Sequence, residues 1–124
     1  MRVFLAITKA LSDETRVRLL LALREGELCV CQLIELLELA PSTISRHLEL
    51  LANAGLIERR KQGRWHYYRL ADDTAPEVVR QAIEWTMDHL AQDPTARHDA
   101  QRLGSIRAKS LEELTECYRP PAIS

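Results

Sequence analysis

The sequence predicts a single, mainly α-helical domain with one small β-hairpin. The chain has 124 residues, which is enough for one hydrophobic core but too few for two domains. Aromatic residues make up only 5% of the chain while leucine is abundant, a composition that suits packed helices better than sheets. Apolar residues recur at helical spacing along most of the chain, whereas a segment after residue 55 is rich in strand formers.

Two helices are predicted at the N-terminus. Phe4, Ile7 and Leu11 recur at the spacing of one helical face. Residues 12–15 then carry hydroxyl and carboxylate groups that suit a helix start. The apolar run that follows predicts a second helix, which ends at Gly26 because glycine is typical just after a helix.

A pair of helices separated by a short turn follows. Residues 30–38 place four apolar side chains on one face, which predicts a short third helix. Pro41 is tolerated in the first turn of a helix and opens the fourth. The fourth helix has Ile44, Leu48 and Leu51 at i, i+4 and i+7, so these three residues are its buried face.

The pattern changes after the fourth helix. Segments 56–61 and 65–70 are rich in strand formers and flank a turn at residues 62–64, which predicts a two-stranded hairpin. A fifth, longer helix is expected after Pro76, and Asp93–Pro94 is expected to stop it. The last thirty residues carry a weaker signal, although Ser110–Glu113 matches a helix capping box.

Basic residues concentrate on the fourth helix and the hairpin. Between Pro41 and Leu70 there are six basic and two acidic residues, a local charge of +4, although the whole chain carries −1. The order helix, turn, helix, hairpin is that of a winged helix-turn-helix, whose second helix enters the major groove of DNA. The candidate DNA contacts on the outer side of the fourth helix and at the hairpin tip are Ser42, Thr43, Ser45, Arg46, His47, Arg60, Lys61 and Arg64. The alternatives are an ordinary solvated basic face, or a winged helix that binds protein and not DNA.

Several segments resemble the ArsR/SmtB family of metal-sensing bacterial repressors. They are Ser12–Leu20, Ser42–Leu48 and Ala54–Ile57 with Gly63–Arg64, and the resemblance extends over roughly residues 3–90. It implies a homodimer, packed through the first and fifth helices, that binds an imperfect palindrome in operator DNA and is released when metal binds. On this basis residues 1–92 are the DNA-binding and dimerisation domain, and residues 93–124 are a C-terminal extension, partly helical, that carries Cys117.

Cys29 and Cys31 stand at the start of the predicted third helix. Residues i and i+2 of a regular helix point apart, so the two thiols converge on one ion only if the helix start is distorted or not yet helical. A helix N-terminus also lowers the pKa of a thiol, and metal binding requires thiolates. The alternative is that both are small buried apolar residues.

Residues 27–33 resemble the arsenical-responsive branch of the family, whose motif has a third cysteine where this chain has Ile34. The resemblance implies arsenite or antimonite as inducer and no organic cofactor. Trivalent arsenic prefers three thiolates, so Cys117, from the same protomer or its partner, is the remaining candidate; a hydroxide or an exogenous thiol is the alternative third ligand. We expect the inducer to shift the third helix and displace the fourth from DNA.

Other functions are less consistent with the sequence. A sensor of cadmium, lead or zinc remains an alternative because thiolates bind soft metals broadly. A second metal site at Asp88, His89 and His98 fails on spacing, since adjacent helical residues point about 100° apart. The sequence lacks the Cys-x-x-Cys motif of a thiol oxidoreductase, and it contains no catalytic set of residues. A redox-responsive repressor is a further alternative. The longest apolar stretch has five residues, so no membrane helix is predicted and a cytoplasmic location is expected.

Overall fold

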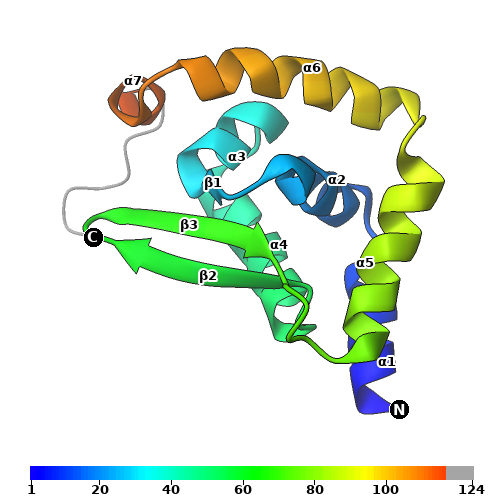
Figure 1. Ribbon diagram of the computed structural model, residues 1–124. Coiled ribbons are helices and arrows are strands. Elements are labelled where there is room, and N and C mark those ends of the chain that lie inside the picture. The colour runs from blue at the N-terminus through cyan, green and yellow to red at the C-terminus, as the bar shows by residue number, and fades with distance from the viewer. Residues whose placement is uncertain (117–124) are drawn as a thin grey trace.

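The computed structural model describes residues 1–116, which form helices packed around a small antiparallel sheet (Figure 1). In chain order the elements are α1 (Arg2–Ala10), α2 (Glu14–Ala22), the 3-10 turn η1 (Leu23–Glu25), β1 (Leu28–Cys29), α3 (Val30–Leu37), α4 (Pro41–Asn53), β2 (Ile57–Gln62), β3 (Trp65–Leu70), α5 (Glu77–Leu90), α6 (Pro94–Ala108) and α7 (Leu111–Glu116). None of the helices in this part of the chain is long and apolar enough to cross a membrane.

The fold class and the five predicted helices are confirmed, and local causes account for the starts of α2 and α4 and for the turn of the hairpin. The Asp13 side chain accepts a hydrogen bond from the backbone N–H of Arg16 and so caps α2. Pro41 occupies the first turn of α4, where its missing N–H costs nothing. Gly63 has φ +61 between β2 and β3, a left-handed conformation that glycine adopts without strain.

The sheet differs from the prediction because it has three strands in the order β1-β3-β2. The first strand pairs Leu28 with Tyr68 and Cys29 with Tyr67, both on β3. A strand of two residues has no alternating pattern, so the sequence signals only the hairpin. The added strand joins the start of α3 to the hairpin through backbone hydrogen bonds.

The prediction that Asp93–Pro94 stops the fifth helix places the end of that helix too late in the chain. The fifth helix already ends at Leu90, and Asp93 accepts hydrogen bonds from the N–H groups of Thr95 and Ala96 to cap α6. The sequence of α6 has a weak apolar stripe because only three of its residues are buried, and one of these, Asp99, is charged. The capping box at Ser110 and Glu113 is confirmed at the start of α7, where each residue receives a hydrogen bond from the backbone N–H of the other.

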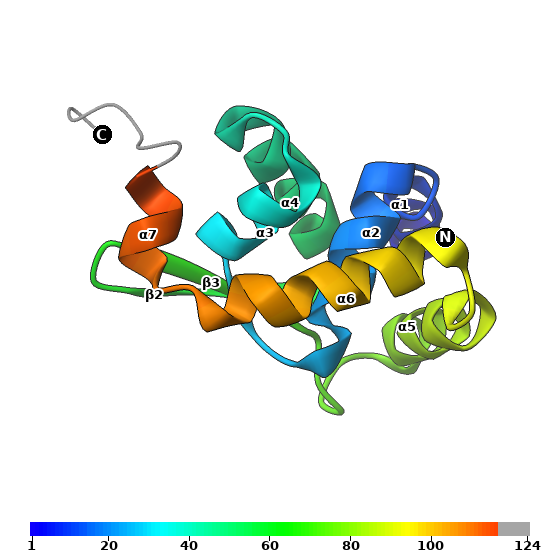
Figure 2. The same cartoon turned by 90° about the horizontal axis from the view of Figure 1, so that it is seen from above.

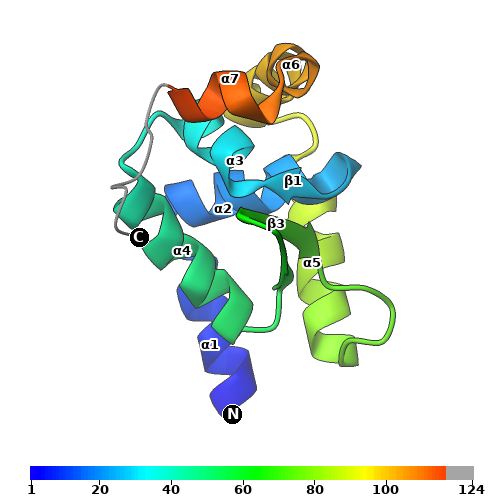
Figure 3. The same ribbon diagram turned by 90° about the vertical axis from the view of Figure 1, so that its left-hand side faces the viewer.

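The third helix lies at the centre of the molecule, with α7 on one side and α2 and α4 on the other (Figure 3). Its apolar side chains meet fully buried leucines of α2 and α4. The C-terminal helices α6 and α7 lie across α2 and α3 (Figure 2) and add Leu103, Ile106 and Leu114 to the same core. Residues 94–114 therefore take part in the packing that positions α3.

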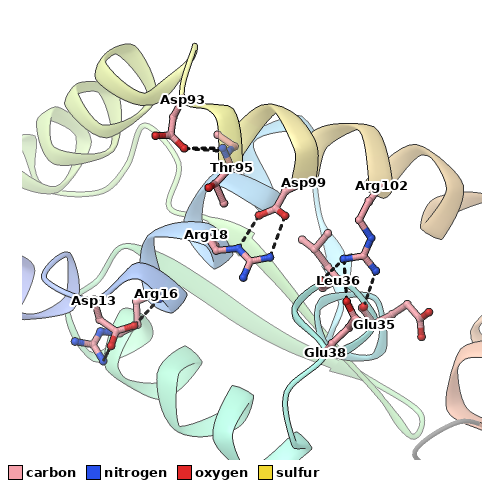
Figure 4. A network of polar contacts seen from close by, with 11 residues as sticks. Asp13, Arg16, Arg18, Glu35, Leu36, Glu38, Asp93, Thr95, Asp99 and Arg102 are labelled. Carbon is pink, nitrogen blue, oxygen red and sulfur yellow. Dashed lines mark hydrogen bonds and ion pairs between the residues drawn. The ribbon is translucent and has the colours of Figure 1, made fainter.

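A buried ion pair attaches α6 to α2. The Arg18 guanidinium donates to both oxygens of Asp99, at 2.8 and 3.0 Å (Figure 4). The Asp99 side chain is only 7% exposed, so it depends on Arg18 to replace the water it has lost. This contact holds α6 against α2.

Candidate thiol site and nucleic-acid interface

The two thiols of the Cys29–Cys31 pair converge. Cys29 is the last residue of β1 and has extended backbone angles, φ −74 and ψ 150, while Cys31 lies in the first turn of α3. Because Cys29 is not helical, its side chain is not turned away from that of Cys31, and the two Sγ atoms lie 3.1 Å apart. Both residues are fully buried. Two free thiols thus meet where the sheet passes into the first helix of the helix-turn-helix.

Hydrogen bonds divide the two thiols into a donor and an acceptor. The thiol of Cys31 donates to Cys29, and this contact lowers the pKa of Cys29 to about 7 although burial opposes it. The backbone N–H groups of Cys31, Val30 and His66 lower the pKa of Cys29 further. The same pairing, together with burial, raises the pKa of Cys31. Cys29 is therefore the thiol that ionises near neutral pH.

The pair supplies two ligands to a soft ion. A thiolate lies about 2.3 Å from a bound zinc ion, so one ion of similar size reaches both sulfurs across this separation. Within residues 1–116, no group of three or more His, Cys, Asp or Glu side chains is placed to hold a metal ion. Cys117, the predicted third thiolate, lies outside the described residues. The last described helix, α7, ends at Glu116 and lies beside the start of α3 (Figures 1 and 2).

Removing the donor thiol tests this division. In a Cys117→Ser background, Cys31→Ala should raise the pKa of Cys29 from about 7 by one unit or more, because the thiolate loses its strongest hydrogen bond. The ultraviolet absorbance of the thiolate, followed against pH, measures the change. The single variant Cys117→Ser is the control and should keep a midpoint near 7. An unchanged midpoint in Cys31→Ala contradicts the assignment of Cys31 as donor.

The fourth helix presents part of the predicted DNA-contact set to solvent. Its inner face is buried, whereas Ser42, Ser45 and Arg46 are exposed and Thr43 is half-buried. His47 is also half-buried, and its Nδ1 lies 3.1 Å from Nη1 of Arg16. The other two nitrogens of the Arg16 guanidinium donate to carbonyl oxygens of α1. The side chain of His47 thus joins α4 to α1 and α2, a contact that the sequence does not reveal.

The basic residues of the hairpin are not equally free to meet phosphate. Arg60 donates to both carboxylate oxygens of Glu27, at 2.6 and 2.8 Å, and lies over the ring of Tyr67. Arg64 lies over the ring of Trp65, 4.6 Å from its centroid, and 4.0 Å from a carboxylate oxygen of Glu112.

Two other cations alternate with Arg60 along β2. Lys61 and Arg59 are exposed, and neither is in an ion pair with another residue of the described part of the chain. Arg59 contributes to the local charge of +4 but is not among the DNA contacts predicted from the sequence. The sequence contains the signal for it, the basic run 59–61, but does not show that Arg60 is neutralised by a residue 33 positions earlier.

Large apolar side chains are exposed on α1 and α5, which contact each other. Phe4 is 55% exposed and Trp85 is 60% exposed, and Val3 and Leu5 lie on α1 beside Phe4. An apolar surface of this kind is typical of a site that another protein covers.

Comparison with known proteins identifies the family. The profile described as "Bacterial regulatory protein, arsR family" matches residues 13–59. The arsenic resistance transcriptional regulator ArsR1 of Pseudomonas putida is 43% identical over 101 residues, which cover 81% of this chain and 77% of that protein. The chain belongs to the ArsR family. The predicted resemblance is therefore confirmed, and this ArsR-family chain is a transcriptional regulator and not an enzyme.

Two further relatives bear on the function and the fold of this ArsR-family chain. A cadmium resistance regulatory protein, a CadC homolog from Staphylococcus aureus, is 44% identical, over 62% of this chain and 64% of that protein. The homodimeric winged helix-turn-helix DNA-binding domain of Mb0332 from Mycobacterium bovis superposes with a TM-score of 0.59 at 26% identity, covering 75% of this chain and 86% of that one. In the ArsR-family chain α3 and α4 form the helix-turn-helix, and β2 and β3 form the wing.

Proposed function

We propose that this chain is a repressor that binds operator DNA as a dimer and is released when trivalent arsenic or antimony binds to Cys29 and Cys31. The observation that carries the proposal is the 3.1 Å approach of two buried thiols at the start of α3. The relative named as an arsenic resistance regulator supports the choice of ligand.

The chemistry of capture needs no change of oxidation state. Each thiol displaces one hydroxyl group from arsenous acid, a sulfur–arsenic bond forms, and the hydroxyl leaves as water with the thiol proton. The low pKa of Cys29, about 7, makes it the first nucleophile at neutral pH. The third position on arsenic is taken by Cys117 of the same protomer or its partner, by a retained hydroxide or by an exogenous thiol.

The place of the thiols in the fold links capture to release. Cys29 belongs to the sheet, where it pairs with Tyr67 of β3, while Cys31 belongs to α3. Interiors are close-packed, so inserting an ion between the two sulfurs moves the start of α3 relative to the sheet. The fourth helix follows α3 after a short turn, and its angle to the DNA changes with that movement.

The DNA surface is proposed to be the exposed side of α4 together with the wing. Its residues are Ser42, Thr43, Ser45, Arg46, His47, Arg60, Lys61 and Arg64. Arg46 and Lys61 are the most accessible cations of this set, because Arg60 and Arg64 already have acidic neighbours. A two-fold dimer places the two α4 helices in successive major grooves, about 34–36 Å apart, which fits an imperfect palindrome.

The dimer is proposed to form through α1 and α5. The exposed side chains of Phe4 and Trp85 on these contacting helices favour this surface, as does the homodimer of the related Mycobacterium bovis domain. Sedimentation equilibrium of the full chain tests it. A monomer at micromolar concentration contradicts the proposal.

Operator binding is tested with a duplex that the wild-type protein selects from a random-sequence pool. By fluorescence anisotropy, Arg46→Ala should weaken binding about tenfold, because an exposed guanidinium contacts a base edge or a phosphate. The slope of the logarithm of affinity against the logarithm of salt concentration should also become smaller by about one. Arg97→Ala, an exposed arginine of α6 far along the chain from α4, is the control and should bind as the wild type does. Failure to select any duplex contradicts the function.

A cadmium-responsive repressor is a second candidate, favoured by the similarity to the CadC homolog. The same thiolates would bind cadmium, since soft metals share this ligand. Titrations with arsenite, cadmium and zinc, each followed by sulfur-to-metal absorbance and by release of the selected duplex, distinguish the two candidates. Release by cadmium but not by arsenite would favour the second. Mass spectrometry after peroxide treatment tests the redox-responsive alternative.

A further inference from the structure

The C-terminal end of α3 does not satisfy its own backbone. The helix ends at Leu37, and Glu38 turns the chain with φ 56, a left-handed conformation that is strained for any residue other than glycine. The N–H of Glu38 donates to the carbonyl oxygen of Ile34 at 2.8 Å. Within the described part of the chain, no backbone N–H reaches the carbonyl oxygens of Glu35 and Leu36.

An arginine from α6 supplies the missing donors. Nη1 of Arg102 donates to the carbonyl oxygen of Leu36 at 2.5 Å, and Nη2 donates to that of Glu35 at 3.2 Å (Figure 4). Nη1 also lies 3.6 Å from the carboxylate of Glu38, the strained residue itself. The planar fork of a guanidinium suits two adjacent acceptors, and a positive charge is favourable at a helix C-terminus. Arg102 therefore caps α3 from a position 66 residues further along the chain.

Other contacts hold Arg102 in this position. The ion pair between Arg18 and Asp99 attaches α6 to α2 one helical turn before Arg102. After Arg102, the ammonium group of Lys109 lies 3.5 Å from the carboxylate of Glu35 on α3. Arg102 thus reaches α3 from a helix that is attached on both sides of it.

We propose that Arg102 is a positioning residue for operator recognition, which holds the turn between α3 and α4 and so the angle of α4. The proposal rests on the proposed function, since it concerns the same operator. Strained conformations persist only where surrounding contacts hold them, and Arg102 contacts the strained residue as well as the two carbonyl groups before it. The first exposed residue of α4, Ser42, follows Glu38 by four positions, so a loosened turn changes the orientation of the DNA-contacting face.

The same contacts oppose induction. The described C-terminal helices touch α3 at both ends, α7 beside its start and Arg102 at its last carbonyl groups (Figure 2). A movement of α3 caused by ion capture at the thiol end pulls its last carbonyl groups away from Arg102. The Arg102 contacts therefore belong to the operator-binding state and are lost in the released state.

The test compares Arg102→Met, Arg102→Lys and Arg107→Met in the full chain. Arg107 is an exposed arginine of α6, so its replacement removes the same charge from the same helix without uncapping α3. The probe is a duplex selected by the wild-type protein, and its affinity is measured by anisotropy with and without arsenite. Thermal unfolding checks that each variant is folded at the assay temperature. Hydrogen exchange is measured at residues 38–44.

Without arsenite, Arg102→Met should bind the duplex about tenfold more weakly than the wild type does. The further loss of affinity when arsenite is added should be smaller in Arg102→Met than in the wild type. Exchange at residues 38–44 should rise in Arg102→Met and not in Arg107→Met, while sulfur-to-arsenic absorbance stays unchanged. Arg102→Lys should be intermediate, because an ammonium group restores the charge but not the two-carbonyl fork.

Equal affinity and equal exchange in Arg102→Met and Arg107→Met contradict the inference. Equal affinity with raised exchange also contradicts it, since the turn would then loosen without affecting recognition. A wild-type protein that selects no duplex contradicts the proposed function and this inference together. A wild type that binds and an Arg102→Met variant that binds equally well contradict the inference alone.

Discussion

Replacing Cys29 with serine is expected to abolish release of operator DNA by arsenite and to leave operator binding without arsenite unchanged. Serine has nearly the shape of cysteine and fits the same buried place at the end of β1. Its oxygen, however, is a hard ligand that does not replace a soft thiolate on arsenic. The apparent affinity for arsenite should fall at least about 100-fold, measured as the concentration that releases half of the bound duplex.

Cys31→Ser should behave in the same way, because the two sulfurs lie 3.1 Å apart and act on one ion. Cys117→Ser distinguishes the possible third ligands. If Cys117 binds arsenic, this variant loses one thiolate from the absorbance spectrum and responds more weakly; if hydroxide or an exogenous thiol does so, it responds as the wild type does. Normal release in both Cys29→Ser and Cys31→Ser would show that the thiol site is not the sensor.

Asp99→Ala is expected to lower the free energy of unfolding by about 2–3 kcal/mol, because the Arg18 guanidinium loses both of its acceptors in a partly buried place. The Asp99 side chain is 7% exposed and that of Arg18 is 25% exposed, so water replaces the lost bonds only in part. Urea unfolding followed by circular dichroism, at a fixed protein concentration, measures the change.

The double variant Arg18→Met with Asp99→Leu should be less destabilised than Asp99→Ala, since it leaves no unpaired charge. Glu58→Gln is the matched control on the surface, where Arg69 has Asp72 as a further partner and both members of the pair are about half exposed. It should change stability by less than about 0.5 kcal/mol. A similar change in Asp99→Ala and Glu58→Gln would mean that the buried pair does not anchor α6.

The thiol site was predictable in part. The spacing of Cys29 and Cys31 indicates that they share an ion only outside regular helix geometry, and the structure places Cys29 in extended backbone before the helix. The sequence does not reveal why the backbone is extended there. The reason is the pairing of Cys29 with Tyr67, which depends on a strand 38 positions away in a sheet that local patterns do not show.

The nucleic-acid interface was also predictable only in part from the sequence. Helix periodicity indicates correctly that Ile44, Leu48 and Leu51 face the core, so the outer side of α4 follows from the sequence. The local charge of +4 overstates the free positive charge, because Arg60 is paired with Glu27, an acidic residue that lies outside the segment Pro41–Leu70. Composition counts charges, whereas pairing depends on where the chain brings them together.

By itself, the sequence determined the elements whose causes are local. Their signals are helix periodicity, the caps at Asp13 and Ser110, Pro41 and the turn glycine Gly63. Each of these acts over a few residues, so the sequence alone predicts its effect. Only the tertiary structure decided that β1 joins the sheet, that α6 packs on α2 and α3, and that Arg102 caps a helix 66 residues earlier. These contacts join distant segments, and their partners are selected by the packing of the whole core and not by any pattern near them in the chain.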